Sequence, residues 1–280
     1  MLEIRTMTAD DLPLGMRLKE QAGWNQTLAD WRRILAIQPG GCFVAHLDGR
    51  PVGTTTTCVF GTIAWIAMVL VDEAVRGQGV GRQLMQHALA YLDALPVRTV
   101  RLDATPLGRP LYERLGFVAE YELSRWEGTA NFAGQPPPRV EAAADSQLAA
   151  ICALDRQVTG TDRRRLIERL YQQRPEAMQV VFADGLLAGY SSLRLGTRAT
   201  QIGPIVALDA AAGRLLAEAA LERCAGQPIF LDIPLANCPA AQWAQAQGLR
   251  IQRPLARMRR GAAVDDRPES LWASFGPEKG

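Results

Sequence analysis

Residues that hold metals or build disulfide frameworks are scarce in this sequence. Histidine occurs only twice in 280 residues, at His46 and His87, and neither lies near other candidate ligands. The five cysteines are an odd number, widely spaced and without a Cys-x-x-Cys pair. This pattern argues against a disulfide framework and against a zinc site. We therefore expect no metal and interpret the cysteines as small buried residues, Cys58 being the one nearest the expected chemistry.

Long apolar runs and strong charge are also missing. No run of about 18 apolar residues occurs, and the N-terminal residues lack the apolar core of a signal peptide. The net charge of +2 is too small to imply nucleic acid or an anionic membrane as a partner. We expect a cytoplasmic globular protein, monomeric or homodimeric, that binds neither nucleic acid nor membrane.

Chain length and one proline-rich segment divide the sequence in two. The 280 residues exceed a typical domain of roughly 100–200 residues. The segment GTANFAGQPPPR, at 128–139, has the glycine and proline content of a linker. We predict an N-terminal domain at 1–128, a linker at 129–139, and a C-terminal domain with a tail at 140–280.

The N-terminal domain alternates strand and helix patterns. Two β-rich runs flank Asp48-Gly49, a pair typical of a hairpin turn. The segment at 61–71, GTIAWIAMVLV, is almost wholly apolar, as expected for a strand buried on both faces. A helical pattern from Gly81 to about Leu95, a further strand, a short helix and a closing strand follow. The order predicts an α/β fold.

The second half of the sequence repeats the first. Asp48-Gly49 aligns with Asp184-Gly185 at an offset of 136 residues (184 minus 48). Beyond the next strand, Gly81 aligns with Gly213 at an offset of 132 (213 minus 81), so the second turn is four residues shorter. Because several such matches occur in the same order, we infer a duplicated fold.

A glycine-rich turn separates the apolar strand from the helix that follows. Glycines allow the backbone to approach an anion closely, and the N–H groups at a helix N-terminus attract phosphate. A Walker A loop would need Lys-Ser/Thr where Arg82-Gln83 stand, and a dinucleotide fingerprint would need glycine at Arg82. The turn instead fits the pattern Arg-Gly-x-Gly-x-Gly, with Arg76, Gly77, Gln78, Gly79, Val80 and Gly81.

This turn and its context resemble the GNAT superfamily of acyl-CoA-dependent N-acetyltransferases. The segment PLYERLGF, at 110–117, is similar to a second signature of that family, a helix with tyrosine near its start and Gly-Phe at its end. The resemblance spans residues 3–126 and, more weakly, 140–260. It implies two tandem GNAT-like domains, each a mixed, splayed β-sheet flanked by helices. The alternative is a structural turn with a surface arginine.

The resemblance implies an acetyl-CoA site in the N-terminal domain, where the turn would cradle the pyrophosphate and the splayed strand the pantetheine arm. The residues implied are Val69, Leu70, Val71, Arg76, Gly77, Gln78, Gly79, Val80, Gly81, Arg82 and Thr105. Thr105 stands where relatives often have asparagine, so that contact is altered. The second copy keeps only Gly213 of the turn, so we expect it to be degenerate and the chain to bind one cofactor.

The resemblance also assigns catalytic roles. A backbone N–H near Val69 to Val71 would polarise the thioester carbonyl, and Tyr112 would be the general acid for the thiolate. Tyr112 as a packing residue beside the cofactor is the alternative. The strand at 61–71 has no carboxylate, although many relatives carry a glutamate there. Asp103 as base, Asp103 as a structural acceptor, and a water relay remain open.

The acceptor groove of this fold is lined by the loop between the first two helices, here residues 23–27. Trp24 and Asn25 are the candidate acceptor-binding residues, although an aromatic side chain clasping the helices is equally compatible. The resemblance implies transfer of an acetyl group from acetyl-CoA to a primary amine. Because the strand carboxylate is missing, a non-catalytic acyl-CoA-binding module or metabolite sensor is the alternative.

Overall fold

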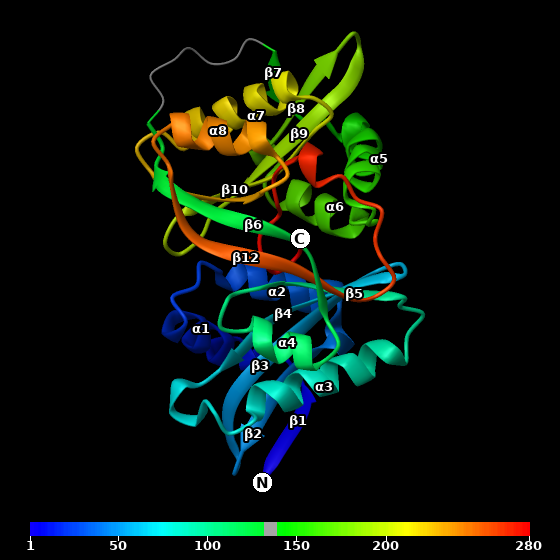
Figure 1. The fold of residues 1–280 in the computed structure, drawn as a ribbon, viewed down its shortest axis with the longest axis vertical. Helices are drawn as coiled ribbons and strands as arrows, with labels where there is room; N and C mark the ends of the chain where they lie inside the picture. Colours follow the sequence, from blue (N-terminus) through cyan, green and yellow to red (C-terminus); the bar gives the residue numbers. More distant parts are fainter. Residues whose placement is uncertain (132–138) are drawn as a thin grey trace.

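The structure is a computed structural model that describes residues 1–131 and 139–280, here called the first and second halves (Figure 1). Short 3₁₀ turns connect several elements of the first half. Its strands and helices, in chain order, are β1 (Leu2–Thr6), α1 (Leu12–Gln21), α2 (Leu28–Ile37), β2 (Cys42–Leu47), β3 (Arg50–Phe60), β4 (Ile63–Val71), α3 (Val80–Asp93), β5 (Thr99–Ala104), α4 (Arg109–Arg114) and β6 (Val118–Thr129).

The second half repeats this order and ends in a tail. Its elements are β7 (Val140–Ala142), α5 (Leu148–Thr159), α6 (Arg164–Gln173), β8 (Met178–Ala183), β9 (Leu186–Arg194), β10 (Thr200–Ala207), α7 (Ala210–Arg223), β11 (Pro228–Pro234), α8 (Cys238–Ala246), β12 (Arg250–Gly261) and β13 (Leu271–Ala273). The predicted α/β fold, with a mixed sheet flanked by helices, is confirmed.

One mixed sheet runs through both halves because they exchange a strand. The order is β1-β2-β3-β4-β5-β12-β6-β11-β10-β9-β8-β7, with β13 also paired to β10. Strand β12 of the second half lies between β5 and β6 of the first, and β6 pairs with β11 of the second. Figure 1 shows β6 and β12 side by side between the two halves. The sequence predicted two sheets and did not predict this exchange.

The duplication is visible in the backbone itself. Asp48 and Asp184 both have φ of 50°, and the glycines that follow them both have φ of 77°. A Cβ added at Gly53 would lie 2.9 Å from a methyl carbon of Leu84. At the equivalent Gly189 it would lie 2.8 Å from a methyl carbon of Leu216. The repeat therefore extends to the packing of α3 and α7 against their hairpins.

Helices from both halves share one hydrophobic core. Trp31 and Ile34 of α2 belong to the same buried cluster as Ile151 of α5, Leu166 of α6 and Phe275 of the tail. Helices α3 and α7 cover the opposite face of the sheet, each over a separate core. The two halves thus meet through an apolar core as well as through exchanged strands.

Strands β4 and β5 separate beyond their first residues. They pair only at Ile63 to Trp65, opposite Thr99 to Arg101. A bulge bends β4 at this point, because Thr54 pairs with Leu70 whereas Thr56 pairs with Ala67, and Met68 has φ of 50°. The β5-facing backbone groups of β4 beyond Trp65 therefore have no strand partner in the β4–β5 ladder.

In the second half, the tail closes the equivalent gap. Strands β10 and β11 pair only at Thr200 and Gln201, after which β13 pairs antiparallel with β10 at Ile205 and Val206. The backbone N–H of Ser274 then donates to the Asp232 carbonyl of β11, at 2.8 Å. The chain itself thus occupies the space between the two splayed strands.

The linker predicted at 129–139 lies partly outside the described residues, which end at 131 and resume at 139. The boundaries at 1–128 and 140–280 stay predictions. Among the described residues, no helix combines the length and the apolar character needed to span a bilayer.

Candidate functional site

The glycine turn leaves open space in front of helix α3. Gly77 and Gly79 have φ of 83° and 82°, a region that favours glycine. A Cβ added at either glycine would have no neighbour within 4 Å. Gly79 is the N-cap of α3 and offers no side-chain hydrogen bond to the N–H groups of the first turn. These N–H groups and the positive end of the helix dipole suit an anion.

The charged side chains around the glycine turn neither block a phosphate nor repel it. The Nε of Arg76 donates to the Val71 carbonyl at 3.1 Å, and the Arg76 side chain is exposed. Asp72, the nearby acid, is ion-paired with Arg17 and also accepts from the Ala74 N–H at 3.1 Å. The negative charge of Asp72 is therefore compensated.

The corresponding place in the second half is filled. The Asp209 carboxylate accepts from the Ala212 N–H at 2.8 Å and so caps α7 with a negative charge. A Cβ added at Gly213 would overlap the indole ring of Trp272, which packs on the start of α7. Carboxylate and indole together leave no room for a phosphate there, which agrees with the degenerate turn in the sequence.

A pocket lies where β4 and β5 diverge, and both halves line it. Its cavity measures about 40 Å³. The lining residues come from the α1–α2 loop, β4, β5, α4, β12 and the tail: Trp24, Gln26, Ile66, Ala67, Met68, Val69, Leu102, Asp103, Thr105, Tyr112, Arg253, Pro277 and Glu278. The structure thus brings together Val69, Thr105, Tyr112 and Trp24 of the predicted site.

Tyr112 of α4 is the phenol in this pocket. Its ring packs edge-on against Phe117, with ring centroids 6.1 Å apart. Burial raises the pKa of Tyr112 to about 12. This value lies above the ordinary phenol pKa of about 10. Tyr112 is therefore protonated throughout the physiological range and can only donate a proton.

Asp103 is committed to a structural ion pair. Its two carboxylate oxygens accept from Nε and Nη2 of Arg257 at 2.8 and 2.9 Å. Burial raises the pKa of Asp103, while the Arg257 charge opposes that effect. Since both oxygens are held by one guanidinium, the geometry favours the structural role over the base. Burial likewise raises the pKa of Cys58 to about 12, so its thiol stays protonated.

The side chain of Asn25, which we predicted to bind the acceptor, lies in the interface between the two halves. Its side chain is buried, and its Nδ2 donates to the Ala199 carbonyl at 2.9 Å. Its Oδ1 accepts from the N–H groups of Arg198 and Ala199 at 2.9 and 3.1 Å. These bonds join the two halves, and they leave the side chain occupied. The neighbouring Trp24 and Gln26 line the pocket in its place.

Two charged lining residues, Arg253 and Glu278, come from the second half and were not predicted. Glu278 accepts from Gln26 at 3.1 Å and from Lys279 at 3.2 Å, and it pairs with Arg194 at 3.0 Å. The charges of Arg194 and Lys279 outweigh burial and lower the pKa of Glu278 to about 2. No motif surrounds either residue in the sequence, so only the folded arrangement identifies them.

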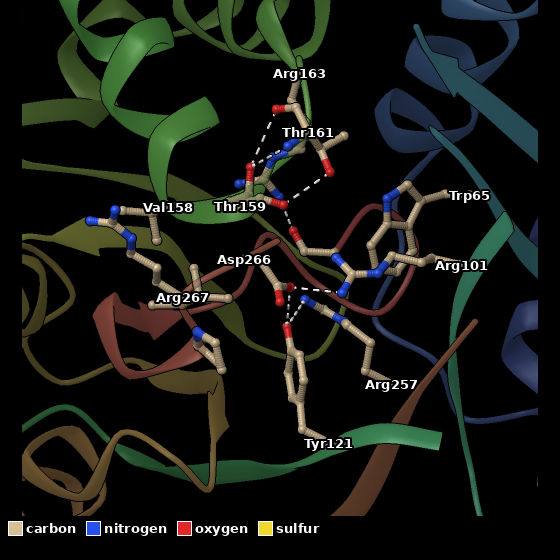
Figure 2. A pocket seen from close by; sticks show the side chains of 13 residues that line it. Trp65, Arg101, Tyr121, Val158, Thr159, Thr161, Arg163, Arg257, Asp266 and Arg267 are labelled. Atoms are coloured by element: carbon tan, nitrogen blue, oxygen red, sulfur yellow. Dashed lines mark hydrogen bonds and ion pairs between the residues drawn. The ribbon is translucent and has the colours of Figure 1, made fainter. Parts of the chain in front are cut away.

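A second, smaller cavity of about 10 Å³ lies nearby, between the halves (Figure 2). Figure 2 shows Arg101, Arg257 and Asp266 converging there beside Tyr121. Arg101 pairs with Asp266 at 2.8 Å, and the Tyr121 hydroxyl donates to Asp266 at 3.2 Å. Since Arg101 also pairs with Glu120 at 2.6 Å and Arg257 with Asp103 at 2.8 Å, these charges are compensated, and we interpret the cluster as interface rather than a ligand site.

Comparisons with known proteins agree with the duplicated fold. Models of the acetyltransferase (GNAT) domain match residues 38–119 and 151–273. An uncharacterised N-acetyltransferase, YitH, of Bacillus subtilis is 27% identical over 228 residues, 78% of this chain and 77% of that protein. An N-alpha-acetyltransferase, MAK3, of Arabidopsis thaliana is 30% identical over 121 residues, 40% of this chain and 63% of that protein.

Two solved structures share the whole architecture. A putative acetyltransferase from Pyrococcus horikoshii has a TM-score of 0.86 at 23% identity, covering 100% of this chain and 96% of the other. A tandem GNAT protein from the clavulanic acid biosynthesis pathway has a TM-score of 0.69 at 17% identity, covering 95% and 100%. At these identities the likeness shows a common fold alone.

Proposed function

Because the chain belongs to the GNAT superfamily of acetyltransferases, we propose that it transfers an acetyl group from acetyl-CoA to a primary amine. One observation carries this proposal. In the first half, the gap between β4 and β5 has an open glycine turn at one end and Tyr112 beside its pocket. In the second half the same gap is filled by β13.

The residues of the first half fit acetyl-CoA. Gly77 and Gly79 leave room for the pyrophosphate, and the first-turn N–H groups of α3 would hold it with Arg76 and Arg82 nearby. The unpaired edge of β4 from Val69 to Val71 would hold the amides of the pantetheine arm. Gln78, Val80 and Gly81 shape the turn, and Thr105 lines the pocket beyond it. We propose one acetyl-CoA per chain.

Acetyl-CoA, when bound, supplies an acetyl group activated as a thioester. Backbone N–H groups of β4 near Val69 would polarise a carbonyl oxygen in the gap, since no strand of the described residues pairs with this edge beyond Trp65. Tyr112 keeps its proton at neutral pH and is placed to donate it within the pocket. These two groups supply electrostatic stabilisation and general acid catalysis.

The amine must lose a proton, and neither lining carboxylate is free to take it. Asp103 is held by Arg257, and the low pKa of Glu278 makes it a weak base. We therefore propose that water accepts the proton. The second half completes this side of the pocket through Arg253, Pro277 and Glu278.

Thiol release on an amine panel tests the proposal. Acetyl-CoA-dependent release that requires both an amine and Tyr112 is the expected result. An acyl-CoA sensor, which the missing strand carboxylate favours, would bind acetyl-CoA tightly yet turn over none of the amines. Calorimetry on the same preparation measures acetyl-CoA binding and separates a sensor from a protein that does not bind it.

A further inference from the structure

Arg253 of β12 lines the pocket that contains Tyr112, and no acidic side chain of the described residues pairs with it. Within residues 1–131 and 139–280, its guanidinium makes no ion pair, and its buried Nε has no hydrogen-bond partner. The two acids of the pocket are already engaged, Asp103 by Arg257 and Glu278 by Arg194. The pocket therefore carries one uncompensated positive charge.

The strand geometry directs Arg253 away from the phosphate turn. The irregularities of β12 fall before Arg253 and after Arg257, so side chains alternate regularly between them. Ala256 and Met258 belong to the core beneath α3, whereas Arg257 turns to Asp103 on the other face. By alternation Arg253 lies on the face of Arg257, opposite α3. Its charge is thus available to the acceptor rather than to the phosphates.

The surroundings of Arg253 leave its charge uncompensated. Arg125 lies directly opposite Arg253 on β6. It donates to both carboxylate oxygens of Asp232, with two hydrogen bonds of 2.7 Å. Burial and the Arg125 charge lower the pKa of Arg253 to about 10, so the guanidinium is still protonated at neutral pH. A partly buried cation beside a second cation is stabilised by an anionic ligand.

We propose that Arg253 binds a carboxylate of the acceptor, so that the acceptor is an amine that also carries a carboxylate. The inference rests on the acetyl transfer proposed above. A planar guanidinium matches a carboxylate with two parallel hydrogen bonds, which would hold the amine end toward β4 and Tyr112. In the transfer, an N–C bond forms as the thioester C–S bond breaks, one proton leaves the amine and one reaches the sulfur. Arg253 is a binding residue in this scheme.

Paired substrates test the proposal on the full chain. The probes are free α-, β- and γ-amino acids, each beside its primary carboxamide, with thiol release as the readout. We expect at least one amino acid to exceed its carboxamide in kcat/KM by roughly 10- to 100-fold, the range of a charge-assisted hydrogen-bonded pair. Arg253→Gln should remove this preference, while the KM for acetyl-CoA stays unchanged.

Arg250→Gln is the matched control, because Arg250 lies on the same strand but is 82% exposed and pairs with Glu127. It should leave the preference intact. Turnover without a preference for the carboxylate, or a preference that survives Arg253→Gln, would overturn the inference but not acetyl transfer. An increase in the acetyl-CoA KM of Arg253→Gln that accounts for its whole defect would assign the residue to the cofactor instead.

A second measurement covers the case in which no amine is turned over, which would count against the proposed function. Calorimetry with the same probes then follows binding to the chain saturated with CoA. Binding of an amino acid that its carboxamide does not share, and that Arg253→Gln abolishes, would support the carboxylate site. Binding of none of the amino acids would overturn it.

Discussion

Arg257 of β12 holds Asp103 of β5 through two hydrogen bonds, and a second arginine–aspartate pair with the same geometry lies elsewhere in the sheet. Arg125 of β6 holds Asp232 of β11 in the same two-pronged way, at 2.7 Å for both bonds. Arg125 and Arg257 occupy equivalent positions of the repeat, 132 residues apart (257 minus 125). Each pair joins an exchanged strand to a strand of the other half. Each half therefore contributes the arginine that neutralises an aspartate of the other half.

Breaking one of these buried pairs should strongly destabilise the protein. Asp103→Asn leaves the buried Arg257 charge without its partner, and such a loss amounts to about 3–5 kcal/mol of the free energy of unfolding. Urea denaturation would measure it. Glu113→Gln breaks the exposed pair with Arg109, which solvent screens, and should change the free energy of unfolding far less. Equal effects of the two substitutions would contradict the structural role of Asp103.

Replacing Tyr112 by phenylalanine should slow turnover without weakening cofactor binding. The ring and its packing on Phe117 remain, but the proton donor is lost, so kcat should fall by about 10²–10⁴-fold. The KM for acetyl-CoA should change little, since its affinity comes from the glycine turn and β4. Tyr91→Phe on α3, which removes a hydroxyl that accepts from Gln38 at 2.7 Å, is the control. Near-normal kcat in Tyr112→Phe would show that Tyr112 only packs.

The alkaline limit of activity follows from the same residue. Tyr112 donates its proton only below its pKa, and burial raises that pKa from 10.0 to about 12. The rate should therefore show no decline from loss of the phenol proton around pH 10, where an ordinary tyrosine would titrate. A pH profile of kcat on a saturating amine measures this. A descending limb near pH 10 that disappears in Tyr112→Phe would contradict the raised pKa.

Calorimetry should find one acetyl-CoA per chain. Gly79→Val places a β-branched residue at a φ of 82° and in front of the helix N-terminus, so binding should be lost. Gly213→Ala, at the counterpart of Gly81 in the second half, should leave the acetyl-CoA affinity unchanged. It should nevertheless lower the melting temperature, because the added methyl overlaps Trp272. Two equivalent sites would contradict the filled second gap.

Acidic pH should weaken the ion pairs that Glu278 of the tail makes beside the pocket. The pKa of Glu278 is lowered from 4.5 to about 2, so its contribution to stability is complete above about pH 4.5 and is lost as the pH falls toward 2. Asp30, which pairs with Arg194 and Arg33, has its pKa shifted the same way. The urea midpoint should fall across this window.

Glu278→Gln tests the assignment of that acid effect. The variant should lower stability at neutral pH, because it leaves the Arg194 and Lys279 charges less compensated. It should also reduce the dependence on pH between about 4.5 and 2, since one titrating group is gone. Glu113→Gln, at an exposed pair with Arg109, should leave the slope unchanged. An unaltered slope in Glu278→Gln would exclude Glu278 as a source of the acid effect.

The features that the sequence predicted well are local. Strand and helix patterns, the turn at Asp48-Gly49 and the glycine turn at 76–81 depend on neighbours in the chain, so periodicity and backbone freedom suffice to find them. The motif at 110–117 likewise places Tyr112 on a short helix, as the structure has it in α4.

The features that the sequence did not predict depend on distant partners. The pattern of β12 marks it as a strand but does not state that it inserts between β5 and β6. The side chain of Asn25 belongs to the interface because residues 198 and 199 carry backbone groups that match it, which a single loop cannot reveal. Arg253 and Glu278 stand in no motif, and only the exchange of β12 and the path of the tail bring them to the pocket.

The placement of β12 also sets an order of assembly during synthesis. Strands β5 and β6 leave the ribosome more than a hundred residues before β12, which must later lie between them. Until residues 250–261 have emerged, the first half holds a glycine turn and Tyr112 on a sheet with a missing strand, and Asp103 has no arginine to neutralise it. Translation therefore has to pass through the second half before the pocket of the first half can be completed. A chain that stalls in the linker would carry the whole glycine turn and still lack a finished pocket.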